Sequence, residues 1–285
     1  MSARTNPPSP QRTASYAGIL RPDELSRRVQ VRRWPASERV APWVENHWSL
    51  RWDLPDGASY DSETLPHPTC SLTVERGTHP RPELAGEEVA ITGVVTRRFR
   101  VDIRGRGRVV GMRFRPGGLA ALTGHSARDW TDRTVPAAGV VSPEVSAALG
   151  ALDLDGDDTA YESGMTAVEA AFPSDRDVDE RYARVLRVVA DMLEDRTFYS
   201  VAQVEERHHV STRTLQRDFL HYIGVGPKWV LARYRMHDVV SALDDGYDGP
   251  LTELAMRHGF YDQAHFTRDF TTLVGVTPSR YRERR

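Results

Sequence analysis

The sequence predicts a multidomain α+β protein, with a β-rich N-terminal domain followed by an all-α C-terminal domain. Residues 98–104 alternate strictly between apolar and charged side chains, which is the period of a strand with one buried face. From Asp179 onward, apolar residues recur at the spacing of an amphipathic helix. An acidic stretch, residues 141–180, lies between the two regions and marks a change of domain.

Composition and length exclude several classes of protein. The chain has 285 residues, 39% hydrophobic and 27% charged, which is an ordinary globular composition. No stretch approaches the ~18 uninterrupted apolar residues of a membrane span, and residues 1–18 lack the apolar core of a secretory signal. We therefore expect a cytoplasmic protein with a flexible N-terminal tail and no membrane contact. The single cysteine, Cys70, excludes an internal disulfide and a multi-thiolate zinc site.

Charge is distributed unevenly along the chain, although its formal net value is only −2. Residues 1–140 sum to +6, residues 141–180 to −10 and residues 181–285 to +2. The acidic stretch is centred on residues 153–158, which are polar and typical of turns. We interpret residues 141–180 as a solvated linker between a β-rich domain at 19–140 and a helical domain at 181–285.

Within the β-rich domain, one stretch predicts two neighbouring strands. After the alternating residues 98–104, two glycines at 105–107 favour a turn, and residues 110–114 resume the period of two. This pattern predicts a β-hairpin with a buried face. A Pro-Gly-Gly sequence then ends the strand, and residues 119–123 favour a short helix.

The helical domain contains an internal repeat. The pattern Arg-Asp-Phe, four residues, Gly-Val, one residue, Pro occurs at 217–227 and again at 268–278, with every matched position offset by 51. Before the first copy, Ser200 and Gln203 have the spacing of a capping box, and Ser211 favours the start of a second helix.

The second copy has the same organisation. A short helix at 252–257 is followed by Gly259, which suits a left-handed turn residue. A short helix, a tight turn and a second helix make a helix-turn-helix motif. We therefore predict two such motifs, at about 200–220 and 251–271, joined by a helix at 227–243. Tandem copies suit successive major grooves of DNA.

The second helix of each motif separates inward from outward residues. Leu215, Phe219, Phe266 and Phe270 are expected in the core. The residues that point outward are Arg213, Gln216 and Arg217 in the first motif, and Gln263, Ala264, His265, Thr267 and Arg268 in the second. Arginine pairs with guanine, glutamine pairs with adenine, and an alanine contacts the thymine methyl group. Arg217 and Arg268 each precede an aspartate, so ion pairing is an alternative role for both.

The helical domain resembles the DNA-binding region of AraC/XylS-type bacterial transcription regulators. The second motif and its flank carry the matching residues Gly259, Phe260, Asp262, Phe266, Arg268, Phe270, Gly275, Pro278, Tyr281 and Arg282. The resemblance implies base contacts by Arg213, Gln216, Arg217, Gln263, Ala264, His265 and Arg268. Lys228, Ser279 and Arg280 lie at helix starts, where backbone N–H groups favour phosphate.

The first motif departs from the family pattern at two positions. Glu205 stands where the family usually has alanine, and His209 stands where glycine usually makes the turn. A buried carboxylate without a partner is costly. We therefore expect Glu205 to reach solvent or an arginine.

The N-terminal domain resembles the sensory domain of a subset of these regulators, on residues 42–53 and especially 111–118. The resemblance implies a cupin-like domain that binds a small effector or forms a homodimer. Four residues of this domain are of types that bind metal ions: His47, His67, Cys70 and His79. The cupin metal signature is absent, so we expect no metal and no cofactor, and a redox role for Cys70 is the weaker alternative.

These observations predict a sequence-specific, double-stranded DNA-binding transcription regulator that responds to a small ligand and is not an enzyme. Its expected partners are promoter DNA, RNA polymerase, an effector and a second copy of the chain. The alternatives are a partner-binding regulator with a degenerate first motif and a cupin-like enzyme fused to a DNA-binding domain. A DNA-repair alkyl transferase needs activated cysteines, for which Cys70 lacks the sequence context.

Overall fold

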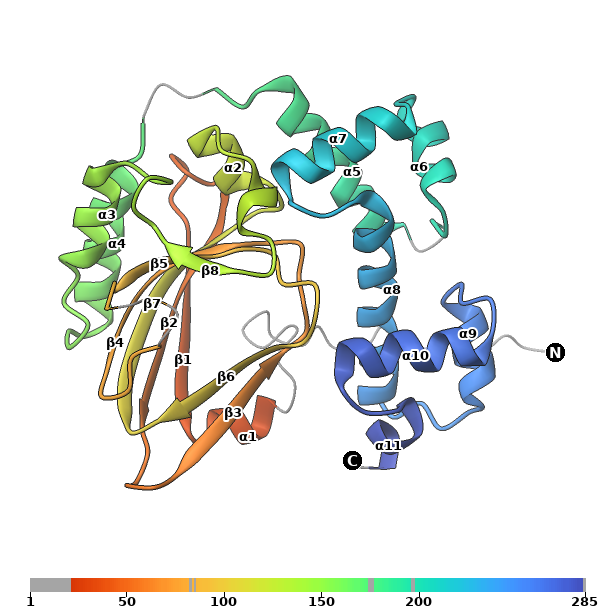
Figure 1. Ribbon diagram of the computed structural model, residues 1–285, viewed down its shortest axis with the longest axis horizontal. Helices are drawn as coiled ribbons and strands as arrows, with labels where there is room; N and C mark the ends of the chain where they lie inside the picture. The colour runs from red at the N-terminus through yellow and green to blue at the C-terminus, as the bar shows by residue number, and fades with distance from the viewer. Residues whose placement is uncertain (1–21, 82–83, 85, 174–176, 196–197, 284–285) are drawn as a thin grey trace.

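The computed structural model describes residues 22–81, 84, 86–173, 177–195 and 198–283. The predicted flexible tail at 1–18 lies outside them. Figure 1 shows a β-sheet domain on one side of the molecule and helices α5 to α11 on the other. Within the described residues, no helix combines the length and apolarity needed to cross a membrane.

A six-stranded antiparallel sheet forms the centre of the N-terminal domain. Its strand order is β1-β2-β7-β4-β5-β8. The strands are β1 (Val29–Pro35), β2 (Val44–Asp53), β4 (Ser71–Gly77), β5 (Val89–Thr92), β7 (Arg106–Phe114) and β8 (Thr134–Pro136). The short helix α1 (Pro22–Ser26) precedes β1, and residues of the central strands are buried on both faces of the sheet, as the burial pattern of β7 shows.

A separate two-stranded sheet consists of β3 (Ser59–Thr64) and β6 (Phe99–Arg104), paired antiparallel from Ser59–Arg104 to Thr64–Phe99. The predicted hairpin between residues 98–104 and 110–114 is therefore wrong in its pairing, although both strands form. Gly105, with φ of 52°, turns the chain, but β6 then pairs with β3 while β7 lies between β2 and β4. A period of two identifies a strand with a buried face and does not identify its neighbour.

The acidic stretch 141–180 is not the solvated linker that its charge predicts. It forms α3 (Pro143–Gly150) and α4 (Asp158–Ala170), which pack on the sheet. Leu149 and Val168 are completely buried. Arg76 and Arg108 of the sheet donate hydrogen bonds to the carbonyls of Leu152 and Leu154, both at distances below 3 Å. Most of the described acidic residues lie on the outer faces of these helices, although Glu169 is buried, and the apolar faces belong to the core of the N-terminal domain.

Between the sheet and the helical domain lie α2 (Gly118–Thr123), as predicted at 119–123, and the 3-10 helix η3 (Ala127–Trp130). The C-terminal helices are α5 (Glu180–Glu194), α6 (Val201–His208), α7 (Thr212–Tyr222), α8 (Pro227–Asp244), α9 (Leu251–Arg257), α10 (Gln263–Val274) and α11 (Pro278–Glu283). Figure 1 places α7 near the start of α8 and α10 near its end.

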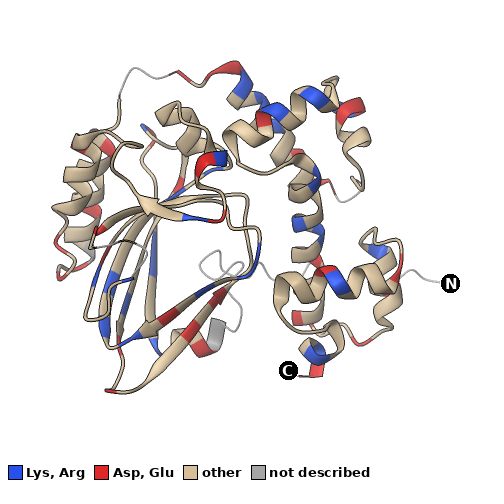
Figure 2. Cartoon of the chain, in the orientation of Figure 1, with Lys and Arg blue, Asp and Glu red and all other residues tan. Residues whose placement is uncertain are grey.

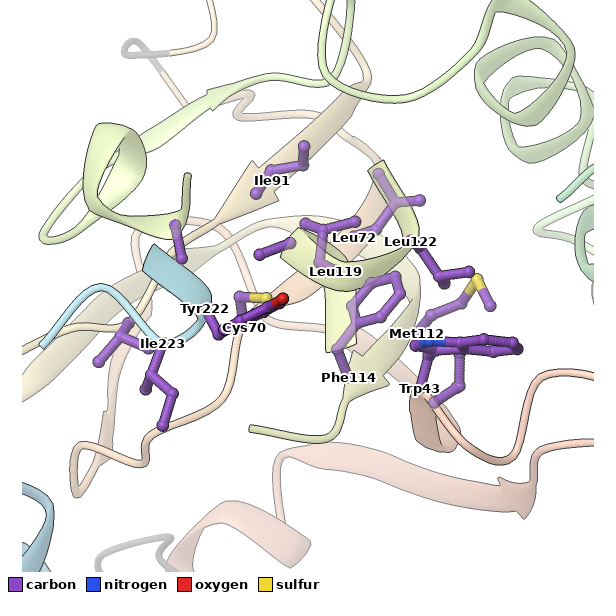
Figure 3. Packing of buried hydrophobic residues seen from close by; sticks show 14 of the residues in the cluster. Trp43, Cys70, Leu72, Ile91, Met112, Phe114, Leu119, Leu122, Tyr222 and Ile223 are labelled. Atoms are coloured by element: carbon purple, nitrogen blue, oxygen red, sulfur yellow. The ribbon is translucent and has the colours of Figure 1, made fainter. Parts of the chain in front are cut away.

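The buried residues divide into clusters that do not follow the two domains. The largest cluster joins one face of the six-stranded sheet to α5, α6 and α7, so that Tyr222 and Ile223 lie beside Cys70 and Leu119 (Figure 3). A second cluster contains the core of α9 and α10 together with Leu65, from the loop after β3. The first and second helix pairs therefore contact different parts of the N-terminal domain.

Candidate nucleic-acid interface and a buried cavity

The first helix-turn-helix motif consists of α6 and α7. Ser200 and Gln203 form the predicted capping box, and the side chain of Ser211 caps α7. His209 occupies the turn with φ of 52°, a left-handed conformation that glycine adopts more easily. Leu215 and Phe219 are buried, as their spacing predicts.

Glu205 is partly exposed to solvent, as expected from its position, and its carboxylate also has a partner on the next helix. It is half-buried and accepts a hydrogen bond from the hydroxyl of Thr212, the first residue of α7. This hydrogen bond lowers the pKa of Glu205. The carboxylate thus joins the two helices of the motif, and the missing alanine is replaced by a polar contact.

On the outer face of α7, the side chains of Arg213, Gln216 and Arg217 are exposed. Arg217 lies 3.4 Å from the carboxylate of Asp218. Asp218 itself is buried and accepts shorter hydrogen bonds from Arg184 and Arg181 of α5. Because Asp218 already has two closer partners, the guanidinium of Arg217 remains available at the surface.

The second motif consists of α9 and α10, with Gly259 at φ of 71° in the turn, as predicted. Asp262 caps α10, since its carboxylate accepts a 2.7 Å hydrogen bond from the backbone N–H of His265. Phe266 and Phe270 are completely buried with ring centroids 5.8 Å apart. Local caps and an aromatic core therefore position this helix.

The outer face of α10 carries four exposed residues that the sequence predicts to contact bases: Gln263, Ala264, His265 and Arg268. His265 also lies 3.2 Å from Asp269, one turn further along the helix. The residues predicted to contact phosphate, Lys228, Ser279 and Arg280, are exposed at the starts of α8 and α11. Figure 2 shows that α3 and α4, with their acidic residues, lie on the opposite side of the molecule from α7 and α10.

A cavity of about 260 Å³ lies between the six-stranded sheet and the β3–β6 sheet. Its position could not be predicted from the sequence, because residues far apart in the chain line it. Its apolar wall is contributed by strands of both sheets and includes Trp48, Leu50, Trp52, Phe99, Val101 and Ile103. Pockets that bind small molecules are typically concave and mostly apolar, with a few polar groups that orient the ligand.

The charged residues of the cavity wall are mainly basic. Glu75 and Asp102 line it, but each is paired with a lining arginine, Arg81 at 3.0 Å and Arg104 at 2.6 Å. Arg33 and Arg113 line the wall as well, and Arg113 pairs at 3.2 Å with Glu45, which does not line the cavity. Among the described lining residues, positive charge therefore exceeds negative charge.

His67 lines the same cavity on the loop between β3 and β4. Its Nε2 atom is buried and has no hydrogen-bond partner among the described residues. Burial, reinforced by the positive charge of Arg113, lowers the pKa of His67 well below its usual value. The imidazole is therefore neutral at neutral pH, in surroundings that favour an anion.

The loop also contacts the helical domain. The His67 ring lies against the ring of His237 on α8, with centroids 4.3 Å apart. Arg233, also on α8, is buried and donates a hydrogen bond to the carbonyl of Pro66. Burial lowers the pKa of Arg233 to about 9, so its guanidinium stays protonated at neutral pH.

The four residues considered as metal ligands do not come together. His47 is buried and lies 2.6 Å from Glu169 of α4, a pair within the core. Cys70 is buried, and burial raises the pKa of its thiol to about 12, which suppresses thiolate chemistry. His79 is exposed beside Thr78. Within the described residues, no group of three or more potential ligands could hold a metal ion.

Comparisons with known proteins address the two halves separately. Residues 204–284 match the family described as a helix-turn-helix domain, and this match spans both copies of the internal repeat. The last third of the chain therefore matches a helix-turn-helix family, in the same region that resembles AraC/XylS-type regulators. Residues 32–136, which precede this helix-turn-helix domain, match a domain of unknown function, DUF6597. A comparison with curated proteins finds no match.

Three solved structures illustrate the similarity. The C-terminal domain of AraT, a response regulator from Geobacillus stearothermophilus, is 24% identical and covers 38% of this chain and 89% of its own, with a TM-score of 0.34. The C-terminal domain of the response regulator YesN from Fusobacterium nucleatum is 21% identical, over 36% of this chain and 99% of its own, with a TM-score of 0.31. ToxT from Vibrio cholerae is 12% identical, over 90% of this chain and 98% of its own, with a TM-score of 0.41.

Proposed function

We propose that the protein is a transcription regulator whose AraC/XylS-type domain binds specific sequences in double-stranded promoter DNA. The main support for this proposal comes from α7 and α10, the second helices of the two motifs. Each is capped by a side chain at its start, and each exposes polar side chains suited to base edges. The capping box of the first motif and the Glu205–Thr212 contact support DNA binding by both motifs. They count against a partner-binding role with a degenerate first motif.

A selection from random duplexes tests this function. The purified protein is expected to enrich one sequence, and footprinting of that sequence should show protection in two successive major grooves, about 34 Å apart. Binding without enrichment of any sequence would contradict specific recognition. Protection of a single groove would favour the partner-binding alternative.

The cavity suggests the class of effector. Its apolar wall and the excess positive charge near Arg33 and Arg113 suit an organic acid with an apolar body and one carboxylate. We therefore propose a ligand-responsive regulator rather than an enzyme, acting on transcription through RNA polymerase and binding DNA as a monomer or a homodimer.

Calorimetry with decanoate and 1-naphthoate tests the effector class, with decan-1-ol and 1-naphthylmethanol as neutral controls. A charge-assisted hydrogen bond contributes about 1.5–3 kcal/mol, so each acid should bind at least about tenfold more tightly than its alcohol. Arg113→Gln should remove most of that preference. Equal binding of acids and alcohols would show that the cavity does not select an anion.

A further inference from the structure

We propose that the two-stranded sheet β3–β6 transmits occupancy of the cavity to the second helix-turn-helix motif, while the first motif stays fixed to the N-terminal domain. This inference rests on the proposed function, because it takes the cavity as the effector site. It is based on four sets of contacts: those of the first motif, those of the second motif, those between the loop after β3 and α8, and those that hold the far end of β3–β6.

The first motif and the six-stranded sheet share one core. Figure 3 shows Tyr222 and Ile223, from the end of α7, packed among residues of the sheet and of α2. Thr131, just after η3, donates a 3.0 Å hydrogen bond to the carbonyl of Gly224. Gly224 has φ of 91°, and a side chain there would meet Thr131 and Ala127. A continuous core with such close backbone approach favours a single rigid unit.

The second motif contacts the N-terminal domain through one end of β3–β6. Leu65, directly after β3, is buried in the core of α9 and α10. Arg98, directly before β6, donates a 3.4 Å hydrogen bond to the carbonyl of Val274 at the end of α10 and pairs with Glu63 at 3.0 Å. Thr64 and Phe99 are partners in the strand register, so both contacts lie at the same end of the sheet.

The loop after β3 adds a third connection, to α8. Arg233 donates to Pro66 and lies 2.7 Å from His237, whose ring packs on His67. The Nη1 atom of Arg233 is buried without a hydrogen-bond partner among the described residues. A buried cation with incomplete hydrogen bonding makes this arrangement less stable than a fully satisfied one.

The opposite end of β3–β6 is held in place. Tyr60 and Ile103 are buried in a separate cluster with Trp52 and Leu54. Between the two ends, the inner side of the sheet lines the cavity. A ligand that separates the two sheets would therefore move the end beside Leu65 more than the end beside Tyr60. The second motif would move with it, which changes the separation of the two recognition helices.

Spin-label distances test this directly. Labels are placed on introduced cysteines at three exposed positions, Arg128→Cys in η3, Glu206→Cys in the first motif and Met256→Cys in the second; the native Cys70 is buried. Decanoate or 1-naphthoate at saturation should shift the 128–256 distance and leave the 128–206 distance unchanged. Equal shifts in both distances, or no shift in either despite bound ligand, would overturn the proposal.

Two arginines on the same edge of the molecule provide matched variants. Arg98 contacts α10, whereas Arg100, two residues along, pairs with Asp61 at the surface. Arg98→Gln should broaden the 128–256 distance distribution without ligand, while Arg100→Gln should not. With ligand, coupling between sites typically changes affinity by about 5- to 150-fold. Arg98→Gln should reduce the ligand's effect on binding to the selected duplex to less than about twofold, with calorimetric ligand affinity retained.

The proposed effector class and the proposed transmission route through β3–β6 can be disproved independently. If calorimetry shows that neither acid binds, the proposed effector class is wrong, and the ligand-free comparison of the two variants still decides the role of β3–β6. If the acids bind but Arg98→Gln and Arg100→Gln behave alike in distance and in DNA binding, the transmission route is wrong and the effector class stands.

Discussion

Arg184 donates a 2.6 Å hydrogen bond to the buried carboxylate of Asp218, and this contact joins α5 to the first recognition helix. Arg181 donates to the same carboxylate at 2.8 Å. Asp269 occupies the equivalent position of the repeat but lies near the surface beside His265. The same Arg-Asp-Phe sequence therefore stabilises the fold in one copy and contributes to a surface pair in the other.

Asp218→Asn should lower the free energy of unfolding by about 2–4 kcal/mol, because it leaves two arginines without their shared anion. Burial alone would raise the pKa of Asp218, but hydrogen bonds from Arg184 and Arg181 lower it overall. The stabilisation is therefore present above the unfolded-state pKa and is lost as the pH falls through the folded-state value. Urea unfolding at several pH values measures both effects. Asp269→Asn is the matched control, with an expected loss of about 0–1 kcal/mol.

Arg213→Ala and Gln216→Ala should each weaken binding to the selected duplex by about 1–3 kcal/mol. Both side chains are exposed, so the free energy of unfolding should change little. Fluorescence anisotropy with the selected duplex and with a random-sequence duplex separates the two kinds of contact. An equal loss on both duplexes would show that these residues contact only phosphates.

The two helix-turn-helix motifs could be predicted because their signals are local. A cap such as Ser200 or Asp262 and a turn residue such as Gly259 act within a few residues of the helix they define. The strand pairing and the cavity could not be predicted in this way. Pro66 and Arg233 meet across a large separation in sequence, as do His67 and His237, and only the packing of the loop after β3 against α8 brings these residues together.

The acidic segment 141–180 shows why net charge alone predicts a solvated linker incorrectly. Most of its described carboxylates face solvent, with Glu169 buried beside His47 as the exception, and its apolar residues lie on the inner faces of α3 and α4. Net charge reflects the exposed side of an amphipathic helix and does not reveal whether the other side is buried. The arginines of the sheet that bind this segment lie on strands β4 and β7, far from it in sequence.

Leu149→Ala tests the packing of this segment. Because Leu149 is completely buried, truncating it should cost about 2–5 kcal/mol in the free energy of unfolding. Glu162→Ala, at an exposed position of α4, should stay within about 0.5 kcal/mol of the unaltered protein. In a solvated linker both substitutions would be neutral, so denaturant unfolding of the pair distinguishes the two descriptions.

His67 should make the stability of the protein depend on pH. Burial and the charge of Arg113 keep its folded-state pKa well below the usual 6.5 of an unfolded chain. As the pH falls below about 6.5, the unfolded chain binds a proton that the folded chain does not, so stability decreases. The decrease for this one group approaches about 1.4 kcal/mol per pH unit.

His67→Gln should reduce the change of the free energy of unfolding with pH, measured by urea unfolding between about pH 5 and pH 7. This range spans the usual histidine pKa of about 6.5. His125→Gln, at an exposed histidine, should keep the slope. A bound carboxylate near His67 would raise the folded-state pKa, so decanoate should bind more tightly at pH 6 than at pH 8, about one unit either side of neutrality. If decanoate affinity is the same at both values while His67→Gln still flattens the slope, the carboxylate does not lie beside His67.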